Sequence, residues 1–277
     1  MGSSFWESWD LFGDAYLTGL LCAVMLALVG VVQTAKREVF AGIAAAQAST
    51  LGIAIALSIA PIGSDHHSQH GLPWVLGIGF AIIGTVVPGI GRRIGESSEA
   101  VCAWVFLCGA SFSVLVLAHS PHGLEEVQRL MFSSLIGADR HDVYAFAGLT
   151  LLSILLVSLR HRQILLVATD PEFALAVGIP QRRYALASSI WVGILLGCAI
   201  HTVGSLFTFS CLVLPPMSAK FLCRTMRAMF PVAALIALGS SFVAFVIADS
   251  YDYPPGQMAA GLQIVLVVVC LLLRRRR

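Results

Sequence analysis

The chain has 277 residues, of which 58% are hydrophobic and only 12% are charged, and its net charge is +2. Soluble domains carry about 25% charged residues, and a fold of this size needs a polar surface that this composition does not supply. The composition therefore excludes soluble enzymes, nucleic-acid-binding proteins and disordered scaffolds, and it predicts an all-α polytopic membrane protein.

Apolar stretches close to the ~20 residues needed to cross a bilayer recur along the whole chain. They cover residues 15–34, 39–61, 73–91, 99–119, 142–160, 184–203, 204–222, 228–249 and 256–273. The pair 184–203 and 204–222 also fits one span followed by a re-entrant segment, so we expect eight or nine spans. No domain-sized soluble segment separates them, and residues 1–277 are expected to form a single membrane domain.

Basic residues predict the orientation of the spans, because cytoplasmic connections carry an excess of Lys and Arg. Fifteen of the 17 basic residues fall in alternate connections, and only Arg129 and Arg140 lie on the other side. Most acidic residues lie on that other side as well. The pattern predicts a multi-pass protein with a cytoplasmic C-terminus, and nine spans place the N-terminus outside.

Several chemical motifs are missing from the sequence. It contains neither GxxxxGK[ST] nor HExxH, so no nucleotide site or zinc protease site of those types is expected. Its seven cysteines lie in or at the ends of apolar spans without a CxxC pair, which is typical of small packing residues. Ligation of a soft metal would require the cysteines to converge in space.

The connection between Arg160 and Tyr184 is expected to contain a short cytoplasmic helix. Thr169 or Asp170 is the candidate N-cap, Pro171 suits the first helical position, and Glu172 suits the positive end of the helix dipole.

The same helix has an apolar face and a clear end. Phe173, Ala174 and Val177 share one face at helical spacing, Gly178 is a natural C′ residue, and Pro180 stops the helix. Helices that lie on lipid usually carry Lys or Arg on their polar face, whereas this one begins with two acids. We therefore favour a protein-docking helix over one lying on membrane lipid.

Residues 170–180 closely resemble the coupling-helix signature of bacterial ABC permeases for divalent metals, the ABC-3 family. Residues 203–206 and 212–219 look like that family's "VGxLL…LLVxPxxxA" segment, and residues 97–99 and 130–137 are similar to weaker family motifs. The resemblance covers essentially the whole chain. It implies that a separate ATP-binding cassette ATPase docks on Asp170, Pro171, Glu172, Phe173, Ala174, Val177, Gly178 and Ile179.

The resemblance also implies the chain's partners and its place in the cell. The partners would be that ATPase, a periplasmic or lipoprotein metal-binding protein and a second permease subunit, all at a bacterial inner membrane. The chain itself would be a permease and not an enzyme. It would hold no cofactor, only a transported divalent ion such as zinc, manganese or iron(II), whose identity stays open.

The second span departs from the family pattern "GDALSHAVLPG". Here the acid is replaced by Ile43, the histidine by Gln47 and the proline by Leu51. A first-row divalent ion prefers imidazole or carboxylate donors, and a neutral amide is a weak substitute. We expect Gln47 to line the translocation path and a second, homologous permease to supply the missing donors, so a heterodimer is favoured over a homodimer.

Four histidines are further candidates. His66, His67 and His70 lie in an outward-facing connection and are candidate metal ligands, the alternative being a solvated loop. His201 lies in an apolar stretch, where an ionisable group usually faces a cavity or a partner. It is a candidate for the translocation path, or else it bonds to a backbone carbonyl or a serine.

Two other classes of protein are possible. A gradient-driven secondary transporter would need no acidic docking helix and would show an internal repeat, which we do not find. An intramembrane serine protease is suggested only by Ser111 and His201, which lie in separate spans.

Overall fold

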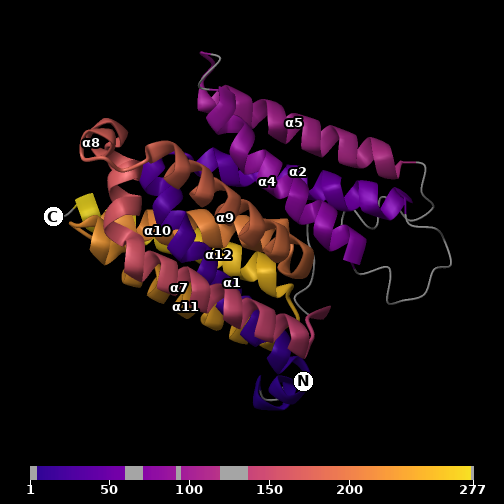
Figure 1. Cartoon of the computed structure of the whole chain (residues 1–277). Helices are drawn as coiled ribbons and strands as arrows, with labels where there is room; N and C mark the ends of the chain where they lie inside the picture. Colours follow the sequence, from indigo (N-terminus) through magenta and orange to yellow (C-terminus); the bar gives the residue numbers. More distant parts are fainter. Residues whose placement is uncertain (1–4, 60–70, 92–94, 119–136, 276–277) are drawn as a thin grey trace. The chain divides into compact units, whose positions relative to one another are not determined.

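The structure is a computed structural model that describes residues 5–59, 71–91, 95–118 and 137–275. These residues form helices and no strand. The helices are α1 (Phe5–Lys36), α2 (Val39–Ile59), α4 (Gly71–Gly91), α5 (Ser98–Leu117), α7 (Arg140–Thr169), α8 (Pro171–Ala176), α9 (Gln181–Val203), α10 (Ser205–Leu222), α11 (Met226–Tyr251) and α12 (Pro255–Arg275) (Figure 1).

Within the described residues, nine helices are long and apolar enough to cross a membrane, which confirms the all-α polytopic prediction and its count of nine. Residues 184–222 form two separate helices, α9 and α10, which are joined at Gly204 and are each long and apolar enough to span a membrane. Gly204 has a φ of 82°, a conformation that suits glycine and ends α9 without a loop.

The predicted end of the fifth span, residue 160, is too early. Helix α7 is 30 residues long and continues through Arg160 and Arg162 to Thr169. Hydropathy marks only the part of a helix at bilayer depth, whereas backbone hydrogen bonding extends a helix until a breaker stops it. The first such breaker after the span is Pro171.

The described contacts group into two compact units, although the prediction of a single membrane domain is not tested by this grouping. Unit 1 comprises residues 1–37, 134–181 and 202–277, and unit 2 comprises residues 38–133 and 182–201.

In unit 2, the central helix is α2, which packs against both α4 and α5. Its small buried residues Ala41, Ala44 and Ala48 pack with Cys102 and Val105 of α5. Small residues let helix backbones approach closely in a membrane, where helix association depends on van der Waals contact.

Glycines set the closest approaches in this unit. A Cβ added at Gly109 of α5 would lie 2.6 Å from the carbonyl carbon and oxygen of Gln47 on α2. A Cβ at Gly193 of α9 would lie 2.6 Å from the Cα of Ile82 on α4. The backbones of α5 and α2 therefore lie in direct contact at Gln47, and those of α9 and α4 at Ile82.

The Gly109 contact leads to a stability prediction. Gly109→Val would push α5 away from α2, and we expect it to destabilise the chain by about 2 kcal/mol or more, as overpacked cores do. Gly79→Val is the matched control, because Gly79 is helical, lies in the same unit and has no neighbouring atom within 4 Å of an added Cβ. Thermal unfolding of the detergent-solubilised chain would measure both, and equal midpoints would contradict the prediction.

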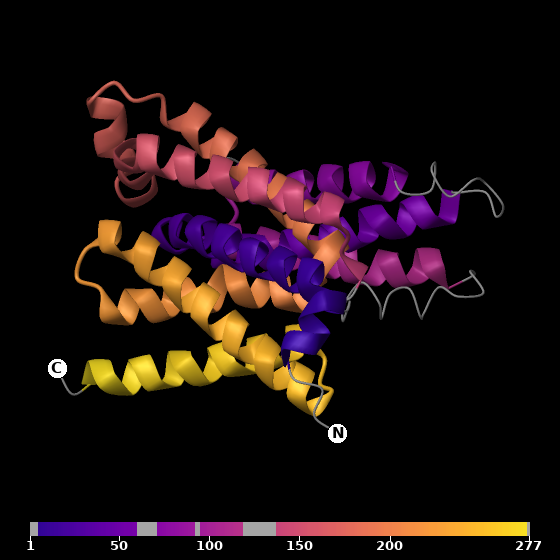
Figure 2. The ribbon, with the colours of Figure 1, turned by 90° about the horizontal axis from the view of Figure 1, so that it is seen from below.

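In unit 1, α1 packs against α7, α10 and α11, and Figure 2 shows it in indigo among these helices. Tyr16 of α1 stacks on Phe245 of α11 with ring centroids 5.5 Å apart, and Phe245 stacks in turn on Phe207 of α10 at 6.0 Å. The Thr150 hydroxyl of α7 donates to the Leu21 carbonyl of α1 at 3.1 Å. Side chains of α7 and α11 therefore contact α1 directly, and Phe207 of α10 packs on Phe245.

Candidate functional site

The short helix α8 begins at a single capping residue. Of the two candidates, Asp170 is the N-cap, because its side chain accepts a hydrogen bond from the Phe173 amide at 3.0 Å. The Thr169 hydroxyl instead donates to the Leu165 carbonyl within α7. The Asp170 amide also donates to the Leu166 carbonyl at 2.9 Å, so one residue closes α7 and opens α8. Pro171 occupies the first turn, as the sequence predicts.

The end of α8 is a complete Schellman motif. The Ile179 amide donates to the Ala174 carbonyl at 2.9 Å, and the Gly178 amide donates to the Leu175 carbonyl at 3.0 Å. Gly178 has a φ of +83°, which confirms the predicted conformation of the C′ residue. Two capping motifs thus stabilise a helix of only six residues.

The apolar face predicted for α8 is only partly exposed. Phe173 and Val177 are 55% and 58% exposed, whereas Ala174 is buried. Leu175, which the sequence interpretation did not single out, is 57% exposed. Helical spacing identifies residues on one face but not the side covered by a neighbour, and α8 packs against α7.

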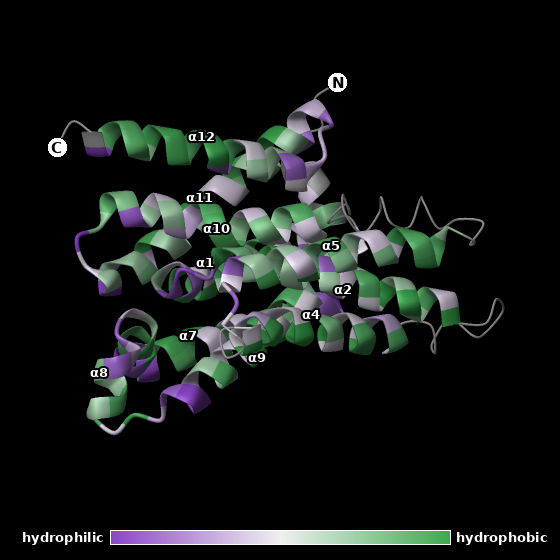
Figure 3. Ribbon diagram, turned by 90° about the horizontal axis from the view of Figure 1, so that it is seen from above, coloured by the Kyte–Doolittle hydropathy of each residue, from purple (hydrophilic) through white to green (hydrophobic). Residues whose placement is uncertain are grey.

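Charged residues occur in α8 and flank it along the chain. Glu172 is exposed in the first turn of α8, and exposed arginines lie on both sides of it in the chain: Arg160 and Arg162 in α7, Arg182 and Arg183 in α9. Figure 3 shows hydrophilic residues on α8 and at the start of α9, while apolar residues dominate the other helices. An exposed apolar ridge with charge around it has the composition of a protein-docking surface.

The three departures from the family pattern fall on one line of α2. Ile43, Gln47, Leu51 and Ile55 are each four residues apart and partly exposed, while most residues between them are buried. Positions four apart lie on one face of a helix. Gln47 is thus on the side of α2 that α4 and α5 leave partly open.

His201 lies in the last turn of α9, where its ring is tilted against Trp74 of α4 with centroids 4.9 Å apart. The sequence interpretation singled out His201 but gave no sign of Trp74, since only packing brings the first turn of α4 to the last turn of α9.

The described residues contain no group of three or more His, Cys, Asp or Glu side chains that could hold a metal ion. The described cysteines therefore do not converge into a soft-metal site, and each is a free thiol. The candidate ligands His66, His67 and His70 lie outside the described residues.

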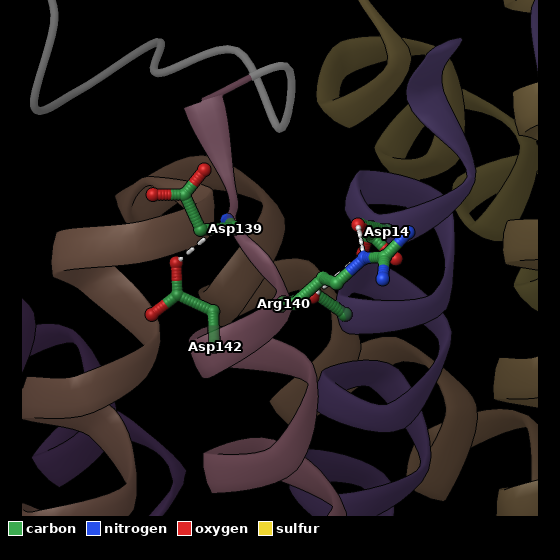
Figure 4. A network of polar contacts seen from close by, with 5 residues as sticks. Asp14, Asp139, Arg140 and Asp142 are labelled. Atoms are coloured by element: carbon green, nitrogen blue, oxygen red, sulfur yellow. Dashed lines mark hydrogen bonds and ion pairs between the residues drawn. The ribbon is translucent and has the colours of Figure 1, made fainter. Parts of the chain in front are cut away.

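One polar network in unit 1 was not predicted (Figure 4). The Arg140 Nε of α7 lies 3.4 Å from Asp14 Oδ2 of α1, and the Asp139 amide donates to Asp142 in a capping box. Tyr16 of α1 donates to Asp249 of α11 at 3.1 Å. The ion pair is largely exposed and contributes at most about 1 kcal/mol. Its value lies in joining helix ends, not in catalysis.

Comparison with known proteins identifies a family and a fold. Residues 8–274 match the model of the ABC 3 transport family. The chain is 24% identical over 71% of its length to the manganese transport system membrane protein MntC of Halalkalibacterium halodurans, covering 68% of that protein. It is 20% identical over 93% of its length to the chelated iron transport system membrane protein YfeD of Yersinia pestis, covering 82% of that protein.

A solved structure has the same fold. The chain superposes on PsaBC from Streptococcus pneumoniae, solved in complex with a Fab, with a TM-score of 0.78 and 15% sequence identity. The match covers 94% of this chain and 90% of the other.

Proposed function

Because the chain belongs to the ABC 3 transport family, we propose that it is the membrane-spanning permease subunit of an ATP-driven importer of divalent metal ions. The match over residues 8–274 is the observation that carries this proposal. Relatives named for manganese and for chelated iron transport support a metal cargo, without distinguishing between these metals or excluding zinc. ATP hydrolysis then belongs to a separate subunit, and the chain itself is not an enzyme.

The proposed orientation places α8 and the C-terminus in the cytoplasm of the bacterial cell. It follows from the basic connections and from an odd number of spans, which puts the two ends of the chain on opposite faces. A metal-binding protein would deliver the ion to the outer face. The excess of acidic residues on that face would raise the local concentration of cations.

We assign the docking of the ATPase to α8. Its exposed Phe173 and Val177 supply apolar contacts, and Asp170 to Ile179 form a rigid, doubly capped segment between two spanning helices. A rigid segment transmits a displacement to α7 and α9, whereas a flexible loop would absorb it. Closure of the ATPase dimer would in this way reorient the spans.

We assign Gln47 and His201 to the translocation path and expect a second, homologous permease subunit. Gln47 is partly exposed on α2, and His201 is an intramembrane imidazole that Trp74 orients. Neither Ile43 nor Gln47 offers the charged or imidazole donor that a dehydrated divalent ion requires. A heterodimer in which the second subunit carries those donors resolves this shortage.

The metal content of cells that lack this chain tests the proposed function. We expect metal-limited cells without the chain to contain several-fold less of one divalent metal by inductively coupled plasma mass spectrometry, and expression of the wild-type chain to restore it. Uptake should stop when ATP is depleted and should continue when only the proton gradient is collapsed. Unchanged content of every divalent metal would contradict an importer, and the opposite energy dependence would favour a secondary transporter.

A further inference from the structure

Unit 1 contains a cluster of buried polar side chains that the transport proposal does not use. Gln263 of α12 is 1% exposed, and its amide nitrogen donates to the Cys211 sulfur of α10 at 3.4 Å. Ser241 of α11 is fully buried and lies beside the same thiol. All three residues lie in the middle third of their helices, far from the ends where water is available.

Two polar groups of the cluster are buried without a hydrogen-bond partner among the described residues. They are the Ser241 hydroxyl and the Gln263 side-chain oxygen, which is an acceptor. In hydrocarbon such an acceptor costs several kcal/mol, because no bulk water reaches it.

A proline leaves a second acceptor, a backbone carbonyl of α10, without its helical donor. In an α-helix the amide of residue 215 would donate to the carbonyl of Cys211, but Pro215 has no N–H. Pro216 likewise removes the helical donor of the Leu212 carbonyl, but that carbonyl faces the backbone of Gly30 on α1. The Cys211 carbonyl therefore lacks its helical donor on the residue whose side chain already contacts Gln263.

The charge of the cluster selects the ligand. Glutamine, serine, a thiol and a backbone carbonyl are all neutral, so a metal cation bound here would lack a counter-charge, at a high cost within a membrane. A neutral molecule with two O–H donors and an acceptor matches the unmet groups. Buried waters typically make about three hydrogen bonds to such groups.

We infer that a single water molecule is bound between Gln263, Ser241 and the Cys211 backbone. It donates to the Gln263 oxygen and to the Cys211 carbonyl, and it accepts from the Ser241 hydroxyl. The bound water replaces the hydrogen bond that Pro215 removes from α10, and it links α10 to α11 and α12. This inference concerns unit 1 alone and does not depend on the proposed cargo.

Hydroxyl-radical footprinting of the intact chain in lipid tests the inference, since radicals formed from a bound water oxidise the side chains that surround it. Cysteine oxidation would be read by mass spectrometry, with Cys22 as internal reference because it is also fully buried in unit 1. We expect Cys211 to be oxidised several-fold faster than Cys22. Equal rates for the two cysteines would overturn the inference without any variant.

Variants locate the water. Gln263→Leu and Ser241→Ala should each reduce Cys211 oxidation towards the rate of Cys22. Pro215→Ala, which restores the backbone donor, should reduce it as well. Ser240→Ala is the matched control, because the Ser240 hydroxyl already donates to the Ala237 carbonyl of its own helix at 3.3 Å. A fast rate that persists in Gln263→Leu, or an equal reduction in Ser240→Ala, would overturn the assignment.

Discussion

Gly178→Val should separate this chain from the proposed ATPase while leaving it inserted in the membrane. The φ of Gly178 is +83°, and a β-branched residue held in that conformation costs about 1–3 kcal/mol. No atom lies within 4 Å of an added Cβ, so the effect acts through the backbone and not through a steric clash. Loss of the Schellman motif would unwind the six-residue α8, because a helix that short is not stable alone.

Co-purification of the ATPase with the tagged chain, together with metal uptake, measures this effect. Gly95→Val is the matched control: Gly95 has a φ of +86° and the same open surroundings, but it lies in the connection between α4 and α5. Glu172→Lys should also weaken ATPase binding, since it places a cation at the positive end of the helix dipole. Normal co-purification and uptake in both Gly178→Val and Glu172→Lys would refute the docking role of α8.

The second large effect concerns pairing of the permease. In a heterodimer, Gln47→Ala should reduce uptake only mildly, because the second subunit supplies the strong donors, whereas mutation of that subunit's corresponding histidine should abolish uptake. Gln47→Lys should block uptake in either case, since it fixes a positive charge beside the path of a divalent cation. Gln47→Ala therefore tests whether the Gln47 side chain binds the ion, and Gln47→Lys tests whether position 47 lies beside the translocation path.

Co-expression of two differently tagged copies of this chain provides the direct test of pairing. We expect neither copy to retain the other after purification and both to retain a second permease. An active self-dimer that contains no other permease would exclude the heterodimer, and His201 would then be the strongest remaining donor on the path.

Most of the helical architecture was predictable from residue type alone. A run of about 20 apolar residues has few alternatives to a spanning helix, and all nine predicted spans correspond to helices in the described part of the chain. The caps of α8 were predictable for a related reason: Asp170, Pro171 and Gly178 act through their own backbone neighbours, so their chemistry is local.

Features that depend on packing were not predictable in this way. The burial of Ala174, the pairing of Arg140 with Asp14 and the contact between His201 and Trp74 each depend on which helices lie together. Nothing in the sequence around Gln263 indicates that its side-chain amide donates a hydrogen bond to the Cys211 sulfur, 52 positions away. Hydropathy identifies the helices of a membrane protein, but it does not identify their neighbours.

The order of helices within unit 1 bears on how the protein is made. Helix α1 is synthesised before α11, yet Tyr16 of α1 donates a hydrogen bond to Asp249, 233 residues later, and stacks on Phe245 of the same helix α11. Unit 2 can begin to assemble earlier, because α4 and α5 directly follow α2. A nascent chain interrupted before α11 therefore leaves α1 without one of the helices against which it packs.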